Sequence, residues 1–98
     1  MTHSSRTGDI AEHYVITWLW DNGYEVFTNA GCTGPIDVIA VDTVTNMCYH
    51  IDVKSTTAKS KSGYRRSAEQ KHLGVRIVEF NAETRKCRFV NHGELYES

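Results

Sequence analysis

The sequence has few of the residues that stabilise small secreted proteins. Its 98 residues include three cysteines and no CxxC spacing, which argues against a disulfide framework. Cys48 and His50 alternate onto one face of an expected strand, but no second pair with ligand spacing accompanies them. This favours packed, inert residues over a zinc site. Reduced thiols indicate a cytoplasmic protein, encoded by a prokaryote or by a phage inside its host.

Other absences argue against a membrane protein and a secreted protein. The sequence has no run of 18 apolar residues for a transmembrane helix, and its first residues, MTHSSRTGD, lack the apolar segment of a secretory signal. The formal net charge of −1 gives no overall positive field for a polyanion, so any basic surface must be local. We therefore expect one domain over residues 1–98, with no membrane partner and no small organic cofactor.

Residues 5–22 have the periodicity of an amphipathic helix. The apolar side chains recur at a helical spacing and share one face: Ile10, Ala11, Tyr14, Val15, Trp18 and Leu19. Ser4 or Ser5 would cap this helix, and Gly23 would end it. Glu12 falls at the edge of the apolar face, so its carboxylate would face a cleft.

The rest of the sequence predicts short strands and one short helix. Ser67 would cap this helix, which ends near Leu73. The expected strands are residues 24–28, 36–42, 47–54, 75–80 and 86–90. The order α-β-β-β-α-β-β predicts an α/β (α+β) domain, with a mixed central sheet of about five strands flanked by helices.

The stretch YHIDVKST, residues 49–56, places two opposite charges on one strand face. Asp52 and Lys54 are two residues apart, so both side chains point the same way. If strands 36–42 and 47–54 form a hairpin, Asp37 can lie beside Asp52, although the sequence does not fix the register. The Asp52–Lys54 pair has two interpretations. It is either a salt bridge on a solvated face or part of a catalytic site.

Converging carboxylates favour a divalent cation. They repel one another unless a cation neutralises them, and hard oxygen ligands suit Mg²⁺. A metal-bound water is a ready nucleophile at neutral pH, and a nearby ammonium stabilises charge that develops on a phosphate. One glutamate, two aspartates and one lysine are thus suited to phosphodiester hydrolysis.

The pattern formed by these residues resembles that of the PD-(D/E)XK nuclease superfamily. Members of this superfamily have a sheet like that of restriction endonucleases. The motifs are Gly8 and Glu12 in the first helix, Gly34-Pro35-Ile36-Asp37-Val38-Ile39-Ala40, Asp52-Val53-Lys54, and Gln70 on the second helix. Over about residues 6–80 this order is most similar to archaeal-type Holliday junction resolvases. Because the second helix and the last strands are short, a minimal phage or homing endonuclease is the alternative.

This resemblance implies a role for each site residue. Mg²⁺, or Mn²⁺ in its place, would be held by Asp37, Asp52 and the carbonyl of Val53. Glu12 would act directly, through water or on a second metal. Lys54 would position the attacking water, and Gln70 would steady a ligand or the scissile phosphate. The family also implies a homodimer. Ile16 and Trp20 lie outside the apolar face of the first helix and offer a contact for a second copy.

A basic segment follows the Asp-Val-Lys strand. Residues 55–66 are expected to form a polar loop, with four basic side chains and no acid. Such a loop is either simply solvated or contacts DNA phosphates, and its position after the motif favours DNA. The DNA-binding residues expected are Arg6, Ser55, Lys59, Lys61, Tyr64, Arg65 and Arg66, with Tyr64 stacking on a base or sugar.

Three functions follow from these features. The first is a Mg²⁺-dependent DNA endonuclease that acts on branched DNA. The second is a sequence-specific homing or restriction-type endonuclease. The third is a non-catalytic DNA-binding module with a nuclease-like fold, against which the joint presence of Glu12, Asp37, Asp52 and Lys54 argues.

Overall fold

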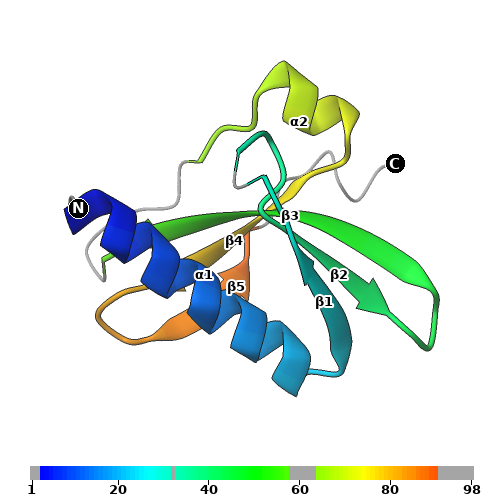
Figure 1. Ribbon diagram of the computed structural model, residues 1–98, viewed down its shortest axis with the longest axis horizontal. Helices are drawn as coiled ribbons and strands as arrows, with labels where there is room; N and C mark the ends of the chain where they lie inside the picture. The colour runs from blue at the N-terminus through cyan, green and yellow to red at the C-terminus, as the bar shows by residue number, and fades with distance from the viewer. Residues whose placement is uncertain (1–2, 32, 58–63, 91–98) are drawn as a thin grey trace.

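The computed structural model describes residues 3–31, 33–57 and 64–90, and the side chains from residue 6 onward within them. A long helix and a short one accompany a five-stranded sheet (Figure 1). The elements are α1 (His3–Asp21), β1 (Tyr24–Thr28), β2 (Val38–Asp42), β3 (Met47–Thr56), α2 (Ala68–His72), β4 (Arg76–Asn81) and β5 (Lys86–Phe89). The predicted element order and mixed-sheet class are confirmed.

The strands lie side by side in chain order, β1-β2-β3-β4-β5. Neighbours are antiparallel except β3 and β4, which run parallel and are joined through the segment that contains α2. A parallel pair needs a crossover connection, and this explains why α2 stands apart from the two hairpins. Figure 1 shows α2 well separated from α1.

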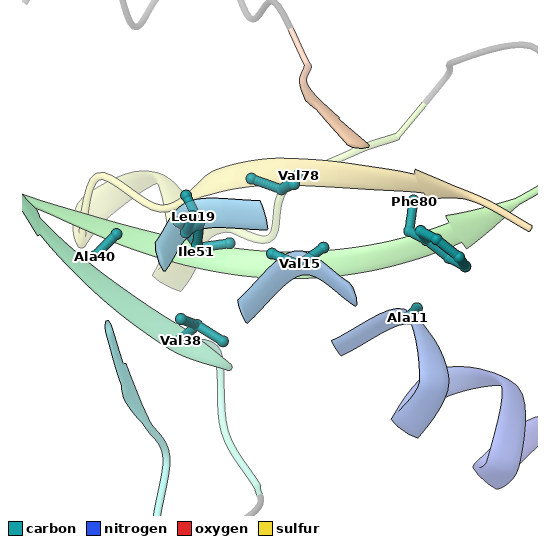
Figure 2. Close-up of a cluster of buried hydrophobic side chains, with 8 residues drawn as sticks. All are labelled: Ala11, Val15, Leu19, Val38, Ala40, Ile51, Val78 and Phe80. Atoms are coloured by element: carbon teal, nitrogen blue, oxygen red, sulfur yellow. The ribbon is translucent and has the colours of Figure 1, made fainter. Parts of the chain in front are cut away.

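The core lies between α1 and one face of the sheet. Three α1 side chains spaced four residues apart, Ala11, Val15 and Leu19, are fully buried, as the helical period requires. Figure 2 shows them facing residues from the three central strands: Val38, Ala40, Ile51, Val78 and Phe80. Tyr14 also stacks on Phe80, with ring centroids 4.7 Å apart. Because side chains alternate along each strand, Asp52 and Lys54 lie on the opposite face from Ile51.

Some boundaries differ from those predicted. The helix α1 begins at His3, so Ser4 and Ser5 lie inside it rather than before its first residue. At its other end Gly23 adopts φ +93°, a left-handed conformation that favours glycine, as expected for a helix end. Strand β3 continues to Thr56 because its parallel pairing with β4 extends that far. No helix in the described part of the chain is long and apolar enough to cross a membrane.

Candidate active site

Two aspartates come together at the start of the β2–β3 hairpin. Val38 is the first residue of β2 and pairs with Ile51, so Asp37 lies just before the strand, beside the part of β3 that carries Asp52. The Asp37 N–H donates to the Ile51 carbonyl at 2.8 Å, and Asp37 Oδ2 accepts from the Val53 N–H at 2.8 Å. These two bonds fix Asp37 against β3 and allow the predicted Asp37–Asp52 contact, which the sequence left open.

The surroundings of Asp37 shift the pKa of its carboxyl group. Burial, a hydrogen bond and charge repulsion from Asp52, and the charge of Glu12 raise the pKa of Asp37 to about 6. The Val53 N–H opposes this shift by stabilising the ionised form. Asp37 therefore exchanges its proton close to neutral pH. Carboxylates that repel one another in this way are what a bound cation would neutralise.

Gln70 links the second helix to this pair. Ser67 and Gln70 form a capping box, in which Ser67 Oγ accepts from the Gln70 N–H and Gln70 Oε1 accepts from the Ser67 N–H. The oxygen of the Gln70 amide is thus turned towards the cap. Its nitrogen donates to Asp52 Oδ2 at 3.0 Å and to the Pro35 carbonyl at 3.1 Å. Gln70 consequently holds Asp52 and the segment before β2 in fixed relation.

Lys54 lies at the open side of the site. Its Nζ is 3.5 Å from Asp52 Oδ2, so the salt bridge considered from the sequence does form. The Lys54 side chain is 45% exposed, whereas that of Asp52 is 11% exposed. The Asp52 carboxylate is thus held in place, with the Lys54 ammonium on its solvent side. A phosphate can approach this ammonium without rearrangement of the strand.

Two carboxylates, rather than three, form the centre of the site. No group of three or more His, Cys, Asp or Glu side chains within the described ranges is arranged to hold a metal ion. Glu12, half-buried on α1, acts on Asp37 through its charge. Metal binding by Glu12 stays a prediction. The paired aspartate oxygens suit a hard divalent cation such as Mg²⁺.

Comparison with known proteins identifies this fold. No protein-family model and no curated protein matches the sequence. The fold is similar to that of a homing endonuclease. The solved structure of the bacterial homing endonuclease I-Ssp6803I superposes with a TM-score of 0.68 at 18% sequence identity. The match covers 99% of this chain and 74% of that one.

The predicted DNA-binding residues differ in their exposure to solvent, and two of them are not described by the structure. Arg6 and Arg65 are exposed, and Ser55 is half-buried within β3 rather than in a loop. Lys59 and Lys61 lie outside the described residues. The half-buried Tyr64 is held by hydrogen bonds to Thr56 and Glu79, and burial raises its pKa.

The expectation for Arg66 is corrected by its burial. The residue is only 6% exposed, and its Nη1 donates to the Val75 carbonyl at 3.1 Å. A guanidinium that is enclosed in this way stabilises the connection between α2 and β4 and is not presented to DNA. The His50 imidazole likewise has a structural partner, the Leu73 carbonyl 2.8 Å from Nδ1, as the sequence suggested.

The sequence analysis missed a charged row beside Lys54. Lys54 is in register with Glu79 on β4, and Glu79 with Arg88 on β5, so the three share one sheet face. Glu79 is buried, and Arg88 binds it through Nε at 3.0 Å and Nη2 at 3.4 Å. The sequence did contain a sign of this row, because Glu79 stands alone in the apolar stretch IVEF. A charge that is buried in a strand needs an oppositely charged partner.

Proposed function

We propose that the protein is a DNA endonuclease of the PD-(D/E)XK type that uses a divalent cation to hydrolyse phosphodiester bonds. The observation that carries this proposal is the pairing of Asp37 with Asp52, next to Lys54 and Gln70. This pairing occurs on a fold shared with a homing endonuclease.

The donor set fits Mg²⁺ or Mn²⁺. The carboxylates of Asp37 and Asp52 and the carbonyl of Val53 would hold the ion, with Glu12 as a further acid. When bound, such an ion lowers the pKa of a water molecule and stabilises charge on a phosphate. Burial first, and then the proximity of Asp52, raise the pKa of Asp37, and a cation bound between the two carboxylates would relieve their repulsion.

The remaining polar groups have defined tasks in this proposal. The Lys54 ammonium, exposed beside Asp52, orients the attacking water and stabilises the phosphate as negative charge develops. The Gln70 amide keeps Asp52 Oδ2 in place. Arg6, Ser55 and Arg65 contribute phosphate contacts, which give affinity without reading sequence. A homodimer would supply one such site for each DNA strand.

The likeness to I-Ssp6803I favours a sequence-specific endonuclease of the homing type. The motif order, with Gly8, Glu12 and the strand GPIDVIA, instead favours a junction resolvase. These two candidates share one chemistry and differ in the DNA that they select.

Removal of the metal is the first test. We expect the purified protein to cut DNA in Mg²⁺ or Mn²⁺ and to bind without cutting in EDTA, because the aspartate pair alone supplies no electrophile. Supercoiled plasmid and a synthetic four-way junction, each incubated with Mg²⁺ and with EDTA, separate the candidates. A unique cut in duplex DNA supports the homing type, and cutting confined to junctions supports the resolvase type. Binding with no cutting of any substrate in either metal would refute the endonuclease.

A further inference from the structure

A second feature of the site face is apolar. Phe27 on β1 pairs with Ile39 on β2, and Ile39 pairs with His50 on β3. Alternation puts this row on the same face as Asp52, since Val26 and Ala40 point to the α1 core. Phe27 is 57% exposed, an unusual position for a large aromatic side chain beside a polar site.

A pocket of about 200 Å³ opens where Phe27 and Ile39 approach Asp37. Phe27, Ile36 and Ile39 supply apolar lining, and Asp37 lines the same pocket. Asp37 therefore belongs both to the candidate active site and to the lining of the pocket. Whatever occupies the pocket is next to the reacting group.

The pocket wall is held in place by Asn29. Its Nδ2 donates to the Thr33 carbonyl at 2.7 Å and to the Ile36 carbonyl at 2.8 Å, and its Oδ1 accepts from the Gly31 N–H at 2.9 Å. The Asn29 N–H also donates to the Asp37 carbonyl at 3.0 Å. These bonds tie the loop before β2 to the backbone of Asp37, so the pocket is formed before any ligand arrives.

We propose that this pocket receives one unstacked nucleobase next to the scissile phosphate, with its face on the Phe27 ring. The inference rests on the proposed endonuclease function and specifies its substrate. A base is flat, and its π-face stacks on aromatic side chains regardless of sequence. In a paired duplex the neighbouring bases cover both faces, so only an extruded, bulged or branch-point nucleotide can enter. The occupant is DNA rather than a second protein copy because Asp37 joins the pocket directly to the proposed phosphate site.

The test measures binding in EDTA, so that it does not depend on cutting. The probes are a 2-aminopurine placed in a two-nucleotide bulge and the same base in a fully paired duplex. We expect the wild type to quench the bulged base, and Phe27→Ala and Phe27→Leu to lose the quenching and about tenfold in affinity for the bulge alone. Phe27→Trp should restore both. Val44→Ala removes an exposed apolar side chain from the β2–β3 turn and serves as the control.

Each outcome is decisive for one of the two proposals. If Phe27→Leu binds the bulge as tightly as wild type while Mg²⁺-dependent cutting persists, the pocket inference fails and the endonuclease stands. If the Phe27-dependent contact is present but Mg²⁺ produces no cutting, the endonuclease fails and the pocket stands. A change from dimer to monomer in sedimentation of Phe27→Ala, with unchanged bulge binding, would assign the pocket to a second copy and overturn the inference.

Discussion

Replacement of Asp52 by alanine should lower Mg²⁺-dependent cutting by about a thousandfold or more. The side chain is proposed to hold the cation, and it is the shared partner of Lys54 and Gln70 in the structure. Its loss removes a ligand and frees both neighbours from their fixed positions, and loss of a preorganised electrostatic group alone costs about a hundred- to a thousandfold in rate. DNA binding in EDTA should be unchanged or tighter, because a negative charge near the phosphate is removed.

Two further variants make this result interpretable. Glu83→Ala removes the same charge from the exposed β4–β5 turn and should cut as wild type does. Asp52→Asn retains the size of the side chain, so that a loss of cutting with an unchanged melting temperature excludes unfolding. If Asp52→Ala cuts plasmid at the wild-type rate in a gel assay, the site is assigned wrongly.

Replacement of Asp37 by asparagine should abolish cutting and also stabilise the protein at neutral pH. The raised pKa of about 6 means that the folded state binds this proton more tightly than the unfolded state, whose carboxyl has its usual value near 3.8. The contribution of Asp37 to stability is therefore present at low pH and is lost as pH rises from about 4 to about 6. Above that range both states are ionised, and the contribution stays constant.

The variant removes this dependence, because an amide carries no charge and still offers an oxygen to the Val53 N–H. With allowance for solvent screening of a half-buried group, we expect a gain of roughly 1 kcal/mol at pH 7.5, or about 4–8 °C in melting temperature. Thermal melts of wild type and variant at pH 4, 5, 6 and 7.5 measure the effect. If the melting temperatures of the two proteins change in parallel with pH over this range, the pKa of Asp37 is not raised by folding.

The periodic parts of the sequence predicted the fold well. Strand 24–28 was found as predicted, and the Ser67 cap and the Gly23 helix end formed at the expected residues. These features depend on local geometry: alternation, a capping side chain and a left-handed glycine. The extension of β3 to Thr56 depends instead on pairing with a distant strand, which local periodicity does not report.

The site was only partly predictable for the same reason. The motif order indicated Asp37 and Asp52 but not their contact, which depends on the bonds of Asp37 to Ile51 and Val53 on the neighbouring strand. Arg66 was misplaced because a basic residue after a basic loop gives no sign that it turns inward to the Val75 carbonyl. Arg88 was missed because its partner Glu79 comes from another strand.

Diffraction from crystals soaked in Mn²⁺ tests the central claim most directly, because manganese scatters anomalously. The account predicts one anomalous peak within bonding distance of both a carboxylate oxygen of Asp37 and one of Asp52. The same soak of Asp52→Asn crystals should show that peak weakened or lost. A strong manganese peak elsewhere, with none between the two aspartates of the wild type, would contradict the account.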